Sequence, residues 1–412
     1  MKNFIAHTDA IREDMLKAVS CASIEDLFKQ IPVQFKEFNM ENPLSEMEAQ
    51  KKVRALAKKD KTEYACFLGG GVYNKFIPAA VNYVAQRFEF LTAYTPYQPE
   101  ISQGTLQIIY EYQTMISRLT GMDIANASMY DGGSACAEAV LMAHRIARGK
   151  KNKALVFDKI NPEYKEVIKT YLWAQGIELE FFEELPESVA DYCCVLIQNP
   201  DYYGEISEIK KLDTTLIVCA NLSSLAILEP PREADIVVGD IQPLGISMNF
   251  GGPHAGYMAC KEAYMRQMPG RLVGKTLDKD GKDAYTLTIQ TREQHIKREK
   301  ATSNICSNQS LIALSATLYL SLVGEEGFKQ TGIMSANMAH ALSKMLAGRG
   351  IRTLNKNFFN EFVIEVSNAD EFLANLKNEG ILGGIKLDKN RILVCTTEMN
   401  TEEEILDYIN AI

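Results

Sequence analysis

The sequence lacks every signal of export, membrane insertion and disulfide cross-linking. Its start, MKNFIAHTDAIREDML, has no apolar stretch behind a basic one, and no window approaches about 18 uninterrupted apolar residues. The nine cysteines are odd in number and scattered, without a Cys-x-x-Cys pair, so neither a disulfide framework nor a zinc ribbon is predicted. We therefore expect a cytoplasmic protein with no membrane-spanning segment and no metal site.

An excess of positive charge is also missing. The chain has 44 basic and 53 acidic residues, a net charge of -9, which disfavours binding to nucleic acid or anionic membranes. Its hydrophobic share of 46% is that of an ordinary globular protein, and 412 residues are enough for a large core and more than one domain. Small molecules and other proteins remain as partners.

The chain divides into three predicted regions. Residues 1–64 read as a helical arm, in which Ser45 and Glu48 form a capping box. From Gly69 the sequence is rich in glycine, proline and tyrosine, through LGGGVYNKFIP and YTPYQPE, which predicts ordered loops without regular structure.

The second and third regions predict a large and a small domain. Residues 65–325 contain apolar, β-branched runs that indicate a buried, largely parallel sheet in an α/β domain. The runs are KALVFD (153–158), CCVLIQNP (193–200), TTLIVCANL (214–222) and ADIVVGD (234–240). The Asp-Gly pair in TLDKDGKDAYTL predicts a hairpin. Residues 326–412 predict a small α+β domain with strands at EFVIEV and RILVC, a helix from Ala369, and a last helix capped by Thr401 and Glu404.

Two glycine-rich turns are candidate ligand sites. Gly132, Gly133 and Ser134 stand at the start of a predicted helix, where free N–H groups could hold a phosphate, although an ordinary helix cap needs the same residues. FGGPHAGY, which contains His254, follows the ADIVVGD strand at a predicted sheet edge, where ligands commonly bind. A lone histidine in a turn is more often structural.

The run QTREQHIKREKATSNIC is the most basic part of the chain, and by default it is a solvated helix face. Interleaved glutamates and small polar residues favour a compact anion pocket over a groove for a polymer. Nearby, Arg271 in PGRLVG follows a Pro-Gly turn, where it could bind a carboxylate or phosphate or join a surface ion pair.

Five long motifs closely resemble the amino-terminal half of glycine cleavage system P-proteins, from about residue 65 to 325. They are YTPYQPE (94–100), EYQTMISRLTGMDIANAS (111–128), FGGPHAGY (250–257), MPGRLVG (268–274) and QTREQHIKREKATSNIC (290–306). The resemblance implies a fold-type-I pyridoxal-phosphate architecture, similar to aspartate aminotransferase. Such proteins have a large α/β domain with a mainly parallel sheet, a small α+β C-terminal domain, and active sites between two such units.

The resemblance also implies a function, that of the alpha subunit of a two-subunit glycine dehydrogenase (decarboxylating). With its companion beta subunit, the chain would decarboxylate glycine by means of pyridoxal phosphate. The aminomethyl group would then pass to the lipoyl arm of the H protein. The assembly implied is a heterodimer or a dimer of heterodimers.

The cofactor lysine of such enzymes is missing at the matching position. Counting eleven residues back from Pro253 leads to Gln242, and an amide forms no imine. The aspartate that keeps the pyridine nitrogen protonated corresponds to Asn221, which carries no charge. The resemblance therefore implies that the companion subunit holds pyridoxal phosphate and that this chain completes the companion's pocket.

The residues that would complete the pocket come from three of these motifs. The implied catalytic groups are His254, His295 and Lys300. The residues that would face partner-bound cofactor or substrate are Tyr94, Tyr97, Gln98, Arg292, Thr302 and Asn304.

Three alternatives remain open at this point. The chain could be a free-standing pyridoxal-phosphate enzyme that uses Lys261, Lys275 or Lys300. It could be a structural scaffold subunit that contributes nothing to the active site. A nucleic-acid-binding protein built on the basic run is disfavoured by the net charge.

Overall fold

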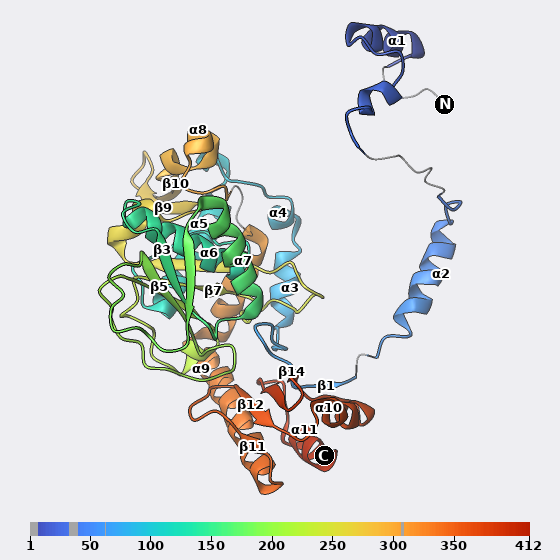
Figure 1. The fold of residues 1–412 in the computed structure, drawn as a ribbon. Helices are drawn as coiled ribbons and strands as arrows, with labels where there is room; N and C mark the ends of the chain where they lie inside the picture. The colour runs from blue at the N-terminus through green and yellow to red at the C-terminus, as the bar shows by residue number, and fades with distance from the viewer. Residues whose placement is uncertain (1–6, 33–39, 62, 306–308) are drawn as a thin grey trace. The chain divides into compact units, whose positions relative to one another are not determined.

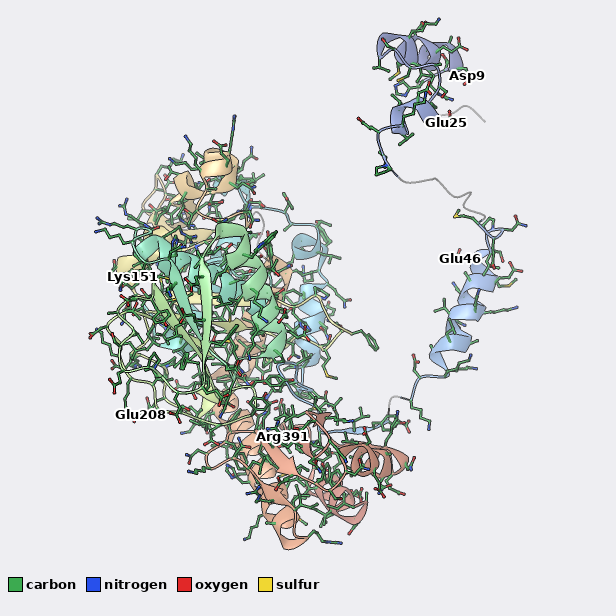
Figure 2. All side chains as sticks on the ribbon, viewed as in Figure 1. Asp9, Glu25, Glu46, Lys151, Glu208 and Arg391 are labelled. Carbon is green, nitrogen blue, oxygen red and sulfur yellow. The ribbon has the colours of Figure 1, made fainter. Side chains whose placement is uncertain are left out.

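The computed structural model describes residues 7–32, 40–61, 63–305 and 309–412. The chain forms two compact units, Met1–Thr62 and Glu63–Ile412. The first contains α1 (Asp9–Ala18), a short 3-10 turn η1 (Glu25–Phe28) and α2 (Glu46–Ala57). Ser45 and Glu48 each accept the other's backbone N–H, which confirms the predicted capping box. Neither α-helix buries a side chain, and Figure 2 shows their side chains projecting outward.

A seven-stranded sheet forms the centre of the second unit, in the order β2-β8-β7-β6-β5-β3-β4. The strands are β2 (Ile124–Ala125), β3 (Lys153–Phe157), β4 (Glu178–Phe182), β5 (Cys194–Asn199), β6 (Thr215–Ala220), β7 (Ile236–Asp240) and β8 (Gly256–Cys260). The five strands from β7 to β4 run parallel, and β8 pairs antiparallel with both β7 and β2. The four apolar runs of the sequence become β3, β5, β6 and β7, so the largely parallel sheet is confirmed.

Helices cover both faces of this sheet, which explains why its strands are continuous apolar runs. Along β6, Ile217 and Cys219 belong to one hydrophobic cluster, whereas Leu216 and Val218 belong to another on the opposite face. The helices are α5 (Gln103–Thr120), α6 (Gly132–Ile146), α7 (Pro162–Gln175) and α9 (Ser310–Gly348). The first cluster contains residues of α6 and α7, and the second contains residues of α5 and α9.

Shorter elements lie around this core. A predicted hairpin is confirmed as β9 (Leu272–Leu277) and β10 (Asp283–Thr288), which pair antiparallel. The glycine-rich stretch after β1 (Ala65–Cys66) leads to α3 (Ala79–Ala85) and α4 (Phe88–Leu91). The prediction that YTPYQPE has no regular structure is wrong at its end, because Pro99 begins the 3-10 turn η2 (Pro99–Ile101).

The C-terminal part has its own small sheet, in the order β11-β12-β15-β14. The elements of this C-terminal part are β11 (Arg352–Thr353), β12 (Glu361–Glu365), α10 (Ala369–Asn378), β13 (Ile381–Leu382), β14 (Ile385–Lys386), β15 (Arg391–Cys395) and α11 (Glu402–Asn410). Thr401 and Glu404 cap α11 reciprocally, as predicted. Figure 1 shows α9 running from the large part into this smaller one. The predicted domain limits at residues 64 and 325 stay predictions.

In the described part of the chain, α9 is the one helix long and apolar enough to cross a membrane by length and composition. Core helices pass the same test, and α9 contributes Ala316 and Tyr319 to one hydrophobic cluster and Leu342 and Leu346 to another. Its interior is interrupted at Gly324, where φ is 64°. The eight cysteines of the described residues are all free thiols.

Candidate functional site

A small cavity lies at the carboxyl-terminal edge of the parallel strands, where α/β proteins commonly bind ligands. Its lining includes Asn221 after β6, Asp240 at the end of β7, Tyr164 of α7, and Tyr73. Its volume is about 40 Å³, whereas small-molecule pockets begin at roughly 300 Å³ and one water takes about 30 Å³ of the liquid. This cavity has room for a water molecule and none for an aromatic cofactor.

Gln242, at the position of the expected cofactor lysine, is fully buried and fully hydrogen-bonded. Its Oε1 accepts the N–H of Tyr73, and its Nε2 donates to the carbonyls of Tyr73 and Ile246, each bond being 2.9 Å long. The amide therefore joins the glycine-rich loop after β1 to the segment after β7. Its donors and acceptor are all used by the backbone, so the side chain is committed to the fold.

The amino terminus of α6, the suggested anion seat, is filled by the chain itself. Asp131 is the N-cap, and its Oδ1 accepts the N–H of Ser134 at 2.7 Å. The N–H of Gly132 donates to Oδ2 of Asp240 at 3.1 Å. A Cβ on Gly132 would lie 2.2 Å from the hydroxyl oxygen of Tyr164, so that hydroxyl already occupies the space beside the helix end. The Asp240 carboxylate thus takes a donor that a bound phosphate would need.

The charged group that lines this cavity is the carboxyl of Asp240, and the chain's own groups surround it. Burial raises the pKa of Asp240 to about 6, opposed in part by the N–H groups of Gln242 and Gly132 and by the charge of His254. The side chain of Asn221 makes a local hydrogen bond, in which its Oδ1 accepts the N–H of Ser223 at 3.0 Å. The carboxylate expected near a pyridine nitrogen is therefore not supplied by residue 221.

A second group of polar residues brings together parts of three motifs, and we call it the Tyr97 cluster: Tyr97, Arg271, Glu293 and His295. Arg271 donates from Nη2 to the Tyr97 hydroxyl at 3.0 Å. One oxygen of Glu293, Oε2, lies 3.6 Å from Nε of Arg271 and 3.7 Å from Nδ1 of His295. The rings of Tyr97 and His295 meet edge to face, with centroids 5.3 Å apart.

The Tyr97 cluster buries charge on one side and faces solvent on the other. Arg271 and Glu293 are only 2% and 7% exposed, whereas Tyr97 is 44% exposed. Arg271 Nη1 and Glu293 Oε1 have no hydrogen-bond partner among the described residues. Burial raises the pKa of Glu293, opposed by the charges of Arg271, Arg292 and His295. Unpaired guanidinium N–H groups are good donors to a carboxylate or phosphate.

Arg292 lies beside this cluster and is itself 8% exposed. Its Nη1 donates to the carbonyl of Met268, while Nε and Nη2 have no partner among the described residues. The basic run forms the short turns η5 (Gln290–Arg292), α8 (Gln294–Lys297) and η6 (Arg298–Lys300). The default interpretation as a solvated helix face is therefore wrong for Arg292 and Glu293.

The other predicted site residues are spread over the surface. Tyr94 is 75% exposed, and Gln98 and Lys300 are exposed as well. Thr302 and Asn304 line a larger cavity beside α6 and α7. His254 is half-buried, with Nε2 3.3 Å from the carbonyl of Met248. Among the described residues, no hydrogen bond or ion pair connects His254 with the Tyr97 cluster.

Sequence reasoning missed the two groups that fill the anion seat. Asp240 ends the run ADIVVGD, and a carboxylate at the carboxyl end of a buried strand was a usable signal. Tyr164 gave none, because its approach to Gly132 depends on how α7 packs against α6. The pairing of Arg271 with Glu293 is also a tertiary contact that spacing does not reveal.

Comparisons with known proteins show the family of the chain. Residues 2–412 match the family described as "Glycine cleavage system P-protein". The chain is 44% identical to the "Probable glycine dehydrogenase (decarboxylating) subunit 1" of Geobacillus thermodenitrificans, with 100% of this chain and 98% of that one covered.

Solved structures show the same fold. The crystal structure of a glycine decarboxylase (P-protein) of the glycine cleavage system, in inhibitor-bound form, aligns with a TM-score of 0.86 and 39% identity, covering 99% of both chains. A glutamate decarboxylase of Lactobacillus brevis aligns at 12% identity with a TM-score of 0.66, covering 92% of this chain and 94% of that one, which is a likeness of fold alone. The predicted fold-type-I architecture is confirmed.

The raised pKa of Asp240 predicts a pH dependence of stability. Because the folded pKa is about 6 and the ordinary value is 3.8, the folded state binds a proton before the unfolded state does, and stability rises as the pH falls through about 6. Between pH ~7 and ~5 the natural chain should gain about 1 kcal/mol over Asp240→Asn. Urea denaturation of the natural chain and of Asp240→Asn at both pH values measures this difference in stability. The pKa of Asp201 is also raised to about 6, but its contribution cancels because both proteins contain Asp201. A pH-independent difference between them would contradict the burial of an ionisable carboxyl at this position.

Proposed function

This chain belongs to the glycine cleavage system P-protein family, and from that premise we propose that it is the non-cofactor-bearing alpha subunit of a two-subunit glycine dehydrogenase (decarboxylating). Together with a beta subunit it acts on glycine, and the aminomethyl group passes to the lipoyl arm of the H protein. The observation that carries the proposal is the small volume, about 40 Å³, of the cavity at the sheet edge.

The family implies pyridoxal phosphate, and this chain's own residues do not fit it. Gln242 provides no amine and is bonded to three backbone groups. Asp240 accepts the Gly132 N–H where a phosphate would lie, and Asn221 supplies no charge. The cofactor is therefore assigned to the companion subunit, which leaves this chain the tasks of binding that subunit and completing its pocket.

The lysines of the alternative, free-standing enzyme are engaged or remote. Lys261 pairs with Asp235 at 3.1 Å, and Lys275 pairs with Asp283 on the β9–β10 hairpin at 2.7 Å. Lys300 is exposed in η6. None of the three lines the cavity at the sheet edge, so none is placed to hold a cofactor there.

A stretch of exposed apolar residues supports the association with a second subunit. Between residues 76 and 101, six large side chains are at least 55% exposed: Phe76, Tyr83, Phe88, Leu91, Tyr94 and Ile101. Exposed aromatic and aliphatic groups of this kind are typical of protein interfaces. Because Tyr97 lies in the same stretch, a subunit docked there would come close to the Tyr97 cluster.

We assign the Tyr97 cluster to the completion of the companion's active site. The buried Arg271 keeps a positive charge behind Tyr97, where it can attract the carboxylate of glycine or a phosphate. The carboxylate of Glu293 lies within ion-pair distance of both Arg271 and His295. The half-exposed ring of His295 is able to carry a proton. His254, Lys300, Thr302 and Asn304 remain proposed contacts of the same pocket, and Arg292, Tyr94 and Gln98 flank it.

The proposed role of His295 predicts a loss of turnover without a loss of assembly. In the complex with the companion subunit, His295→Gln should lower the kcat of glycine decarboxylation by about tenfold or more, since a positioned proton carrier contributes at least that much. The matched control is His7→Gln in the N-terminal arm, which should leave the rate unchanged. Normal turnover in a normally assembled His295→Gln complex would favour the scaffold alternative.

A second prediction concerns the missing lysine. Gln242→Lys should not create a pyridoxal-phosphate site, because the cavity is too small, and it should destabilise the chain by about 2 kcal/mol or more by leaving the Tyr73 and Ile246 groups unpaired. Gln242→Met, which also removes the amide, is the control for stability. Absorbance of an internal aldimine in the Gln242→Lys chain would show that the site is an intact cofactor pocket lacking only its amine.

A further inference from the structure

A larger cavity of about 610 Å³ lies between α6, α7 and the segment that ends the basic run. Its volume is within the range of roughly 300–1,000 Å³ typical of small-molecule pockets. It shares no lining residue with the small cavity at the sheet edge. It is therefore distinct from the sheet-edge cavity, although the function proposed above assigns two residues of its rim, Thr302 and Asn304, to the companion's pocket.

One wall of this cavity carries a buried carboxyl group with half of its hydrogen-bonding capacity unused. Glu138 of α6 is only 2% exposed. Its Oε1 accepts the hydroxyl of Ser303 at 2.6 Å, whereas Oε2 has no hydrogen-bond partner among the described residues. Burial raises the pKa of Glu138, opposed by the hydrogen bond from Ser303 and by the charge of Arg145, and a cation or donor that reached Oε2 would favour the charged carboxylate further.

Basic groups lie further along the same wall. Glu138 and Arg145 are seven residues apart on α6, two turns and about 10 Å along the helix axis, so they share one face. Arg145 Nη2 donates to the carbonyl of Gln267 at 3.1 Å, which holds the guanidinium in place, and its Nε is unpaired. The neighbouring His144 also has an unpaired, buried Nε2 among the described residues.

The two ends of the cavity wall thus offer opposite charges, each with an unused hydrogen-bonding atom. We propose that this cavity binds a small zwitterion, an amino acid whose ammonium group is received by Glu138 and whose carboxylate is received by Arg145. The charges of Glu138 and Arg145 already act on each other, so an anion bound to Arg145 alone would weaken the compensation of Glu138, whereas a ligand that carries both charges matches both groups. Thr302 and Asn304 also line the cavity.

The test is ligand binding to the purified full chain, without companion subunit or cofactor. Calorimetric titration with glycine, β-alanine and 4-aminobutyrate, which differ in the separation of their charges, should give a Kd of about 1 mM or tighter for at least one. Acetate and methylammonium, which carry one charge each, should bind at least about tenfold more weakly. Failure of all three zwitterions to bind, or equal binding of acetate, overturns the proposal.

Substitutions locate the binding. Glu138→Gln and, independently, Arg145→Gln should each weaken the best ligand by about tenfold or more. The matched control is Glu166→Gln, a solvent-exposed glutamate of α7 that pairs with Lys169, which should change nothing. Glu138 is buried, so the affinity of its variant is used only if that variant still unfolds cooperatively on heating. If it does not, the Arg145 variant alone decides. Unchanged affinity in the Arg145 variant overturns the assignment.

Discussion

Three hydrogen bonds from one buried amide determine what the sheet edge of this protein can do. The side chain of Gln242 joins Tyr73, in a loop that begins far away in the sequence, to Ile246 on its own loop. Each backbone group it satisfies would otherwise be buried without a partner, at a cost of about 1–3 kcal/mol. The loop after β1 is thereby held over the ends of the parallel strands, and the space where this fold usually holds a ligand is reduced to about 40 Å³.

Asp240 and the amino terminus of α6 also limit what can bind at this edge of the sheet. The helix end attracts negative charge whatever its source, and here a carboxylate of the same chain meets the Gly132 N–H. Removing a cofactor lysine alone would have left an open pocket with an unfilled anion seat. In the described residues Gln242 supplies no amine, an Asp240 oxygen takes the Gly132 N–H, and the cavity is small, and these three observations are why we propose a supporting role for this half of the enzyme.

The sequence predicted those features that depend on local pattern. Strands buried on both faces must be apolar throughout, so KALVFD and ADIVVGD were recognisable, and Ser45 with Glu48 was enough to place a helix start. The fold type followed from the resemblance of long motifs. The antiparallel strand β8, by contrast, carries no mark of its direction, because alternation and burial are the same either way.

The candidate site was predictable only in part, because it depends on which distant polar groups meet. The Tyr73–Gln242 bonds join residues 169 positions apart, and the contact of Arg271 with Glu293 depends on how the hairpin packs. Tyr97 and His295 were predicted as members of one pocket, and the structure places their rings in contact. Glu138 and Arg145 were not singled out, since on a helix that packs against a sheet their spacing is also that of ordinary surface charges.

The central claim is that the cofactor of the complete enzyme belongs to the companion subunit and not to this chain. It is tested most directly by borohydride reduction in the presence of pyridoxal phosphate, followed by mass spectrometry of each subunit, with this chain alone and with its companion. We predict an aldimine absorbance band only when the companion is present, and a reduced pyridoxyl label only on the companion. A stoichiometric label on one lysine of this chain would contradict the account and make it a pyridoxal-phosphate enzyme in its own right.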